Sequence, residues 1–231
     1  MGVDHLASRI VFEHPALGPT PVTVRQNVAP PGDGRDATAR LVWDAAAPMA
    51  TYLCDHPEVV RGKSVVELGA GPALPGVVAA RLGAERVVLT DLPTELELPA
   101  TNAEANGVAG VATAAACPWG DAAAAETLGT FDVVICSDVL YGHRADVARA
   151  LAVTMRALCK DPGGGGGRGE GGAALLAYFP REKLAEDGAF FDAADELFED
   201  PTPREVGGVA SNDEELWFFE YRPKRREGAG E

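Results

Sequence analysis

The stretch Val65-Val66-Glu67-Leu68-Gly69-Ala70-Gly71-Pro72 decides the fold of this 231-residue chain. A short apolar strand that leads into Gly-x-Gly and then a helix brings bare backbone against a ligand, because a Cβ there would block the approach. Twenty residues beyond Gly71, Asp91 ends the next apolar run, 86–90. In a parallel sheet this carboxylate lies beside the glycine turn, where it can accept hydrogen bonds from both hydroxyls of a ribose. The pattern predicts a nucleoside site, with tight strand–helix packing as the alternative.

The residues after the turn argue against a ligand that carries phosphates. A dinucleotide fingerprint needs a third Gly or Ala three positions on, and here that position is Leu74. Pro72 and Pro75 remove two backbone donors from the start of the helix, and no P-loop lysine follows the turn. S-adenosylmethionine has a ribose and an adenine but no phosphate, so it suits this turn better than a dinucleotide does.

Outward from the turn, β-rich runs alternate with Ala-rich segments. Strands are expected at 64–68, 86–90, 111–115, 131–137, 173–179 and 216–221, the last paired with one at 204–209, and helices at 41–54 (kinked or restarted at Pro48), 75–82, 94–106, 145–158 and 188–199. Strands separated by helices imply right-handed β-α-β crossovers. We therefore expect an α/β fold, with a Rossmann-like, doubly wound, seven-stranded, mostly parallel sheet and an antiparallel C-terminal strand. A hairpin of 9–12 and 21–25 forms a short N-terminal β arm.

The chain reads as one large domain with appendages. Residues 1–40 form the N-terminal arm and a Pro/Gly-rich loop, 41–222 form the domain, and 223–231 form a disordered tail. Eight of the twelve residues 161–172 are glycine, so this segment is predicted to be a flexible surface insertion. A linker between two domains is the weaker interpretation, because the residues from 173 onward supply strands that the sheet still lacks.

Charge and cysteine content indicate which partners, bound metals and cellular compartment to expect. Asp and Glu number 35 against 20 Lys and Arg, a formal net charge of -15, which argues against binding to nucleic acid and suits a basic partner. The four cysteines form no C-x-x-C pair and the four histidines are scattered, so neither a metal site nor a disulfide framework is expected. Reduced cysteines indicate a reducing compartment, and no apolar stretch reaches the roughly 20 residues of a membrane helix. We expect a cytoplasmic monomer that contacts neither nucleic acid nor membrane.

Several ordered motifs carry a resemblance to a known family. Glu67-Leu-Gly-Ala-Gly71 with Thr90-Asp91 resembles the first two motifs of seven-β-strand S-adenosylmethionine-dependent methyltransferases. Leu41-Val-Trp43, Pro118-Trp119-Gly120 and Ser137-Asp138-Val139-Leu140-Tyr141 are similar to the Leu-Trp, Trp-Gly and Asp-x-x-Tyr motifs of the lysine methyltransferase family 16 group. The resemblance covers about residues 38–221.

Three shorter stretches resemble one branch of that group. They are Ser137-Asp-Val-Leu140 followed by His143, Tyr178-Phe-Pro-Arg181, and Asp187-Gly-Ala-Phe-Phe191. They look most like the nicotinamide-N-methyltransferase-like branch, which methylates the N-terminal glycine and an adjacent lysine of elongation factor 1-alpha. The chain departs from the branch at Pro72, at Tyr141 and in the glycine-rich insertion.

The resemblance implies S-adenosyl-L-methionine as the cofactor and assigns its binding positions by motif. The implied cofactor-binding residues are Trp43, Glu67, Gly69, Ala70, Gly71, Asp91, Trp119 and Ser137. In this interpretation Trp43 packs beside the sulfonium, a cation–π contact of up to about 2 kcal/mol when desolvated, and Trp119 flanks the adenine. Ser137 ends a strand at the carboxyl edge of the sheet, where ligands of such folds bind. The alternative for each tryptophan is a core aromatic residue.

Asp138 and Tyr141 are the expected catalytic residues. An amine attacks only when it is neutral, and a lysine with a pKa near ~10.4 loses its proton at neutral pH at a cost of about 4–5 kcal/mol. A carboxylate and a phenol can hold the ammonium, orient it, and receive or relay that proton. The alternative for Asp138 is an N-cap of the following helix. His143 is expected to be a surface or capping residue rather than a base.

The expected function is therefore methyl transfer from S-adenosylmethionine to an amine of a protein, with elongation factor 1-alpha as the acceptor. The acidic surplus would speed association with a basic factor. One alternative is a small heteroaromatic amine such as nicotinamide as the acceptor, although no additional lid domain lies between the strands. The other alternative is a non-catalytic nucleoside-binding module, against which the Asp138–Tyr141 motif argues.

Overall fold

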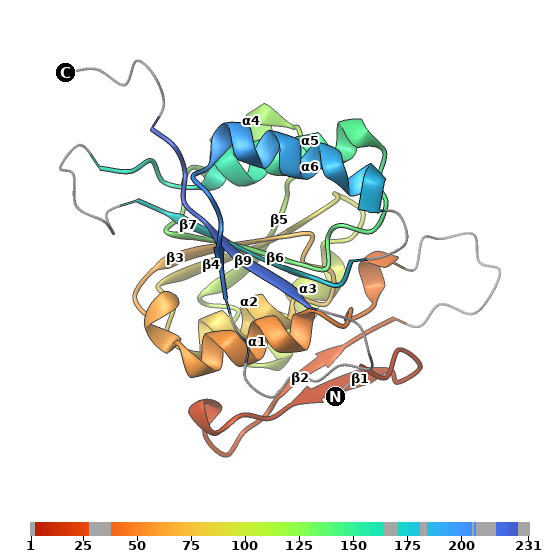
Figure 1. Cartoon of the computed structure of the whole chain (residues 1–231). Helices are drawn as coiled ribbons and strands as arrows, with labels where there is room; N and C mark the ends of the chain where they lie inside the picture. The colour runs from red at the N-terminus through yellow and green to blue at the C-terminus, as the bar shows by residue number, and fades with distance from the viewer. Residues whose placement is uncertain are drawn as a thin grey trace.

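A central seven-stranded sheet organises the molecule (Figure 1). The computed structural model describes residues 3–27, 38–163, 171–180, 184–204, 206 and 216–225. The strands of this sheet are β3 (Ser64–Leu68), β4 (Arg86–Asp91), β5 (Ala112–Ala116), β6 (Val133–Ser137), β7 (Ala173–Tyr178), β8 (Thr202–Pro203) and β9 (Trp217–Tyr221). Their order is β5-β4-β3-β6-β7-β9-β8, with β3 to β7 parallel and β9 antiparallel to β7. The predicted α/β fold with an antiparallel C-terminal strand is confirmed.

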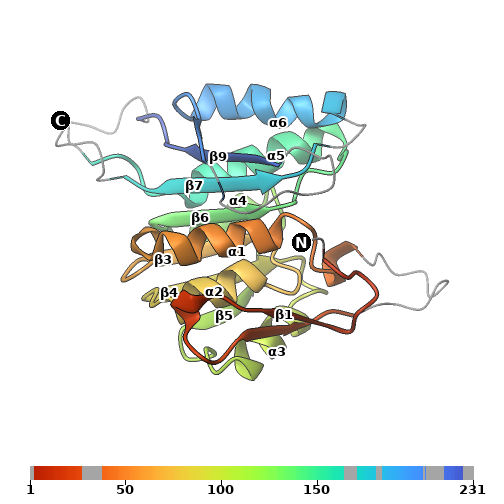
Figure 2. The same ribbon diagram turned by 60° about the horizontal axis from the view of Figure 1, so that its bottom comes forward.

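Helices cover both faces of the sheet, and the N-terminal hairpin lies outside them. The helices are α1 (Ala46–Asp55), α2 (Leu74–Arg81), α3 (Glu97–Ala105), α4 (Ala122–Leu128), α5 (Ala145–Leu158) and α6 (Leu184–Leu197). In Figure 1, α1, α2 and α3 lie on one face and α4, α5 and α6 on the other. The hairpin of β1 (Arg9–Phe12) and β2 (Val22–Arg25) packs beside α2 and α3 (Figure 2). Its β2 backbone donates hydrogen bonds to Asn102 of α3 and to Asn106, the C-cap residue of that helix.

Successive residues of the central strands pack into two cores, one on each face of the sheet. In β6, Val133 and Ile135 face the core under α1 and α2, while Val134 and Cys136 face the core under α5 and α6. All four are at most 1% exposed. This two-sided burial explains why β6 reads as a continuous apolar run rather than as an alternating pattern.

The structure corrects two helix predictions. Helix α1 begins at Ala46 rather than at residue 41, so Pro48 lies in its first turn, where a missing N–H breaks no helical hydrogen bond. Helix α4 has no counterpart among the predicted elements. Its signal is nevertheless present in the sequence, because Asp121 accepts a hydrogen bond from Ala124 N as an N-cap and Gly129 ends the helix.

The ends of the predicted segments also shift. The partner strand expected at 204–209 is β8, at Thr202–Pro203. Within the tail expected from residue 223, Pro223 pairs with Phe198 and Lys224 N donates to Leu197 O, whereas residues 226–231 lie outside the described residues. The predicted loop at 29–36 and most of the glycine-rich insertion lie outside the described residues.

The four cysteines are buried and free. Across the described ranges, no group of three or more His, Cys, Asp or Glu side chains is arranged to hold a metal ion. None of the helices in these ranges is both long and apolar enough to cross a membrane.

Candidate active site

A cavity of about 340 Å³ opens at the carboxyl ends of β3, β4 and β6. Its walls come from the glycine turn after β3, the end of β4, the loops after β5 and β6, and the segment 38–46. The predicted site residues that line it are Trp43, Gly69, Ala70, Gly71, Asp91, Trp119, Ser137, Asp138 and Tyr141. The fold therefore brings together residues that are up to 98 positions apart in the chain.

The glycine turn needs glycine for a reason that the sequence did not reveal. Gly69 and Gly71 have positive φ angles of 64° and 50°. A Cβ at Gly71 would lie 2.9 Å from Ala39 O, and one at Gly69 would lie 3.0 Å from Val139 Cγ1. The expected reason for the bare backbone is the approach of a ligand; in addition, the chain itself leaves no room for a side chain at either position.

Asp91 lies beside the glycine turn, as its spacing predicts. Its Oδ2 accepts a hydrogen bond from Gly71 N at 2.8 Å, and its Oδ1 accepts one from Leu92 N at 2.8 Å. Burial raises the pKa of Asp91, an effect that these two backbone hydrogen bonds oppose. Each oxygen of a carboxylate has a second lone pair, so Asp91 retains acceptor capacity for the hydroxyls of a ribose.

Glu67 is the predicted cofactor residue that does not line the cavity. Its side chain is 1% exposed, and its Oε2 accepts a hydrogen bond from Gly76 N of α2 at 2.9 Å. Burial raises the pKa of Glu67 to about 8. The structure thus places this carboxyl behind the glycine turn, where it holds the start of α2 against β3.

Residues 38–45, here called the strap, form a wall of the cavity ahead of α1. Trp43 Nε1 donates to Thr38 O at 2.8 Å, which fixes the half-buried indole along the strap. The Arg40 guanidinium donates to both carboxylate oxygens of Glu95, at 2.9 and 3.2 Å, and so ties the strap to the segment that follows β4. Because α1 begins only at Ala46, the strap backbone passes directly against Gly71.

Asp138 begins the loop after β6 in an unusual backbone conformation. Its φ is 56°, a left-handed value that Asp tolerates better than most residues, and its side chain is 3% exposed. Its N–H donates to Ala177 O at 2.7 Å, and its Oδ2 lies 3.4 Å from Ala45 N. Helix α5 begins at Ala145 with Arg144 at its N-cap position, so the alternative that Asp138 caps this helix is wrong.

Tyr141 and His143 form the mouth of the cavity. Tyr141 is 38% exposed, and its ring centroid lies 4.1 Å from that of His143. His143 is half-buried, lines the cavity, and meets the ring of Trp119 edge-on at 5.2 Å. The expectation of a surface or capping residue did not place His143 in the cavity wall, where the structure has it. The signal in the sequence is its position two residues after Tyr141, in the same loop at the carboxyl edge of the sheet.

The chemistry of the lining suits S-adenosylmethionine. The described lining residues include the carboxylates of Asp91, Glu95 and Asp138 but no lysine or arginine, so the cavity offers no cationic side chain to a phosphate. Trp43 and Trp119 supply aromatic surfaces for an adenine and a sulfonium. The cavity volume lies within the range of small-molecule sites.

Solved structures share this fold. The T. thermophilus 16S rRNA N2 G1207 methyltransferase, in complex with AdoMet and guanosine, superposes with a TM-score of 0.61 at 20% identity, over 95% of this chain and 51% of that one. A putative O-methyltransferase from Nostoc punctiforme superposes with a TM-score of 0.55 at 14% identity, over 81% of this chain and 59% of that one. At these identities the likeness shows the fold alone.

Relatives identified by sequence identity indicate the family more specifically than the fold does. Protein N-lysine methyltransferase METTL21A of Mus musculus is 38% identical over 53% of this chain and 56% of its own length. EEF1A lysine methyltransferase 3 of Mus musculus is 33% identical over 84% of this chain and 76% of its own length. Protein N-terminal and lysine N-methyltransferase efm7 of Neurospora crassa is 46% identical over 24% of this chain and 20% of its own length. The chain thus spans about half of the first relative and three quarters of the second.

The match to a family is longer than half of the chain. Residues 27–168 match the family described as lysine methyltransferase, and this range contains the strap, the glycine turn and the Asp138–Tyr141 loop. The family confirms S-adenosyl-L-methionine as the cofactor. The chain therefore belongs to the lysine methyltransferase family of S-adenosylmethionine-dependent protein methyltransferases.

Proposed function

We propose that this chain transfers a methyl group from S-adenosylmethionine to an amine of elongation factor 1-alpha, at its N-terminus or at a nearby lysine. The observation that carries the proposal is the acidic cavity, which has no lysine or arginine among its described lining residues and opens at Tyr141. Such a cavity admits both a sulfonium and an ammonium. The name of one relative, EEF1A lysine methyltransferase 3, supports the acceptor, and that of efm7, a protein N-terminal and lysine N-methyltransferase, supports the two positions.

The cavity has a part for each portion of the cofactor. Asp91 would bind the ribose hydroxyls, Trp119 would flank the adenine, and Trp43 would pack beside the methionine portion. Gly69 to Gly71 and Ser137 complete this wall at the carboxyl edge of the sheet. When bound, the cofactor supplies an electrophilic methyl group on a cationic sulfur.

The loop after β6 would receive the acceptor amine. The buried carboxylate of Asp138 provides a charge that an incoming ammonium can pair with, and Tyr141 lies at the mouth, where the amine must pass. Holding the nitrogen in line with the methyl group and excluding water would lower the barrier without further covalent chemistry. In well-oriented systems this effect is worth about 7–11 kcal/mol.

The net charge of -15 fits a basic protein partner. Attraction between the two would raise the association rate, and added salt would lower it. We further propose that the protein acts as a monomer in the cytoplasm, where the four free thiols stay reduced.

Transfer of tritiated methyl groups tests the proposal directly. Purified elongation factor 1-alpha, nicotinamide and a cell lysate serve as acceptors in parallel reactions, and peptide mass spectrometry locates the label. We expect label in the elongation factor. Label in another protein alone would remove this acceptor and leave the enzyme class standing, while label in nicotinamide alone would favour the small-molecule alternative. Cofactor binding with no label in any reaction would favour a nucleoside-binding module.

A further inference from the structure

His143 is the titratable side chain of the cavity mouth that the predicted catalytic pair leaves out. It follows Asp138 and Tyr141 in the same loop, and its imidazole packs between the rings of Tyr141, at 4.1 Å, and Trp119, at 5.2 Å between centroids. Tyr141 was assigned to the acceptor side and Trp119 to the cofactor side. The imidazole therefore lies where these two sides of the cavity meet.

One hydrogen bond fixes which nitrogen of this ring carries a proton. Nε2 lies 3.1 Å from Val139 O. A carbonyl oxygen only accepts hydrogen bonds, so Nε2 is the protonated nitrogen and Nδ1 keeps its lone pair in the neutral ring. Within the described part of the chain, no hydrogen bond engages Nδ1.

The surroundings keep the ring neutral near physiological pH. Burial lowers the pKa of His143, and the Val139 carbonyl and the carboxylate of Asp187 on α6 oppose this effect in part. Asp187 is fully buried, and its Oδ1 accepts a hydrogen bond from Gly142 N at 3.1 Å, which anchors the loop from the α6 side.

The other charged and titratable groups around the loop leave the pKa of His143 lowered. On the side of α5, the exposed Arg144 and Asp146 pair with each other at 3.0 Å. Trp119, from the loop after β5, carries no charge. Asp138 and the phenol of Tyr141 are the remaining titratable groups of the loop itself.

We propose that Nδ1 of His143 is the base that takes the proton from the acceptor ammonium. This inference rests on the proposed amine methylation. In the step, an N–H bond of the ammonium breaks and its electron pair stays on nitrogen as the attacking lone pair. A new Nδ1–H bond forms, and the ring becomes an imidazolium. The proton then passes to water at the mouth of the cavity, which restores the neutral ring.

The division of labour among the three residues follows from their chemistry. A carboxylate such as Asp138 is an effective partner for a cation but a weak base toward an ammonium, whereas a neutral imidazole offers a basic nitrogen lone pair and is suited to proton transfer. Asp138 then binds the charged amine, and His143 removes its proton. Tyr141 packs on the imidazole and holds it in place.

The substitution His143→Gln in the full chain tests the proposal. A glutamine amide can still donate to Val139 O but cannot take up a proton. The matched control is His56→Gln, which alters a half-exposed histidine at the end of α1. With elongation factor 1-alpha as acceptor, we expect kcat at pH 7 to fall about 100-fold for the first variant and to stay unchanged for the second. The loss should shrink about tenfold for each added pH unit, as the neutral amine becomes more abundant, and imidazole in the buffer should restore part of the rate.

A second readout needs no turnover. Nuclear magnetic resonance of the histidine rings, with His143 assigned by its absence in the variant, should show a neutral ring protonated on Nε2 at pH 7. An imidazolium at pH 7, or a neutral ring protonated on Nδ1, would overturn the proposal. So would a kcat of His143→Gln within about threefold of the unaltered protein from pH 6 to 9, or a change confined to KM. Failure of the unaltered protein to methylate any amine would refute the proposed function and the proposal together.

Discussion

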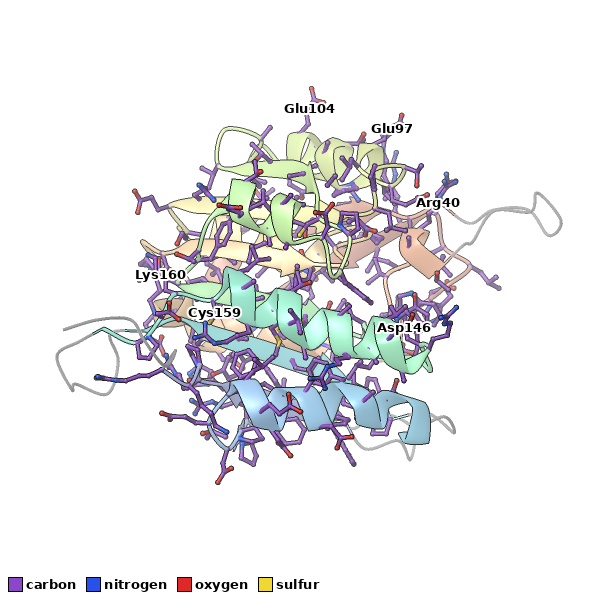
Figure 3. The ribbon with its side chains drawn as sticks, turned by 90° about the horizontal axis from the view of Figure 1, so that it is seen from above. Arg40, Glu97, Glu104, Asp146, Cys159 and Lys160 are labelled. Atoms are coloured by element: carbon purple, nitrogen blue, oxygen red, sulfur yellow. The ribbon has the colours of Figure 1, made fainter. Side chains whose placement is uncertain are left out.

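The two edges of the central sheet hold their carboxylates in different ways. At the amino-terminal edge, Asp132 Oδ2 accepts hydrogen bonds from Ser64 N at 2.9 Å and Oγ at 2.6 Å, and its Oδ1 accepts one from Lys160 at 2.6 Å. Although burial acts in the opposite direction, these hydrogen bonds lower the pKa of Asp132 to about 2. At the carboxyl-terminal edge, burial raises the pKa of both Glu67 and Asp91. Figure 3 shows Lys160 at one end of the molecule and Arg40 and Asp146 at the other.

The difference shows what each edge does. A carboxylate that already has a lysine and two further donors stabilises the fold and has little left to offer a ligand. Asp91 and Asp138 lie in a wall without lysine or arginine among its described residues, so in our proposal their charge attracts an incoming cation, while Glu67 lies behind that wall and serves the fold. The same residue type therefore serves stability at one edge and, in our proposal, binding and catalysis at the other.

The largest expected difference between substitutions at the two edges is in the rate of methyl transfer. The substitution Asp138→Asn keeps the size of the side chain and tolerates the left-handed backbone, but it removes the charge. We expect kcat/KM for the acceptor to fall about 100-fold or more, because the ammonium loses its charged partner, with cofactor affinity nearly preserved, whereas Asp132→Asn at the opposite edge should leave it unchanged. Steady-state kinetics of both variants measure the two effects. Equal losses of activity in both variants would contradict the different roles of the two edges.

The next contrast concerns stability against pH. A buried carboxyl with a raised pKa folds best when it is protonated, so the contribution of Glu67 is fully present below about pH 4.5 and is lost as the pH rises toward 8. The substitution Glu67→Gln keeps an oxygen acceptor for Gly76 N and removes the titration. We expect the variant to match the unaltered protein at pH 4 and to exceed its free energy of unfolding by about 4 kcal/mol at pH 8. Urea unfolding at several pH values measures the gap, and a gap that stays constant with pH would contradict the assignment.

Cofactor affinity gives a contrast of about the same or slightly smaller size. The substitution Asp91→Ala should weaken binding of S-adenosylmethionine by roughly 2–3 kcal/mol, because charge-assisted hydrogen bonds to the ribose are lost. The control Asp121→Ala removes the N-cap of α4, which should cost about 1 kcal/mol of stability and no affinity. Calorimetric titration of both variants with S-adenosylmethionine measures the two affinities. Unchanged affinity for Asp91→Ala would mean that the ribose binds elsewhere.

The smallest expected effect is the pH-dependent contribution of Asp132, at the amino-terminal edge, to the stability of the fold. Because the pKa of Asp132 is lowered, its contribution is present above pH 4 and is lost as the pH falls toward 2. The side chain is about a third exposed, so solvent screening limits that contribution to about 1 kcal/mol. The variant Asp132→Asn should therefore be less stable at pH 6 and nearly equal at pH 2.5. Thermal unfolding at these two pH values is the check, and a deficit that grows in acid would have the wrong sign.

The parts of the fold that depend on local pattern could be predicted from the sequence. The glycine turn at 69–71 and Asp91 at the end of the next strand fix two neighbouring parallel strands and one wall of the cavity. The apolar runs at 64–68 and 131–137 are long enough to identify buried strands. These features depend on neighbouring residues or on parallel-strand geometry, both of which a sequence displays.

The remaining features depend on contacts between distant segments. Trp43 lines the cavity because α1 begins only at Ala46 and the strap packs against Gly71. Neither feature can be predicted from a local sequence pattern. Glu67 follows the strand alternation toward α2 and away from the cavity, although its motif suggested a ligand contact. The location of His143 follows from the rings of Tyr141 and Trp119, the latter from another loop.

A crystal structure of the chain with S-adenosylhomocysteine tests the central claim most directly. The account predicts the nucleoside in the cavity beside Gly69 to Gly71, with ribose hydroxyls about 2.6–3.2 Å from the carboxylate of Asp91 and the adenine against Trp119. A nucleoside bound at any other place on the molecule, or a ribose that makes no hydrogen bond to Asp91, would contradict it.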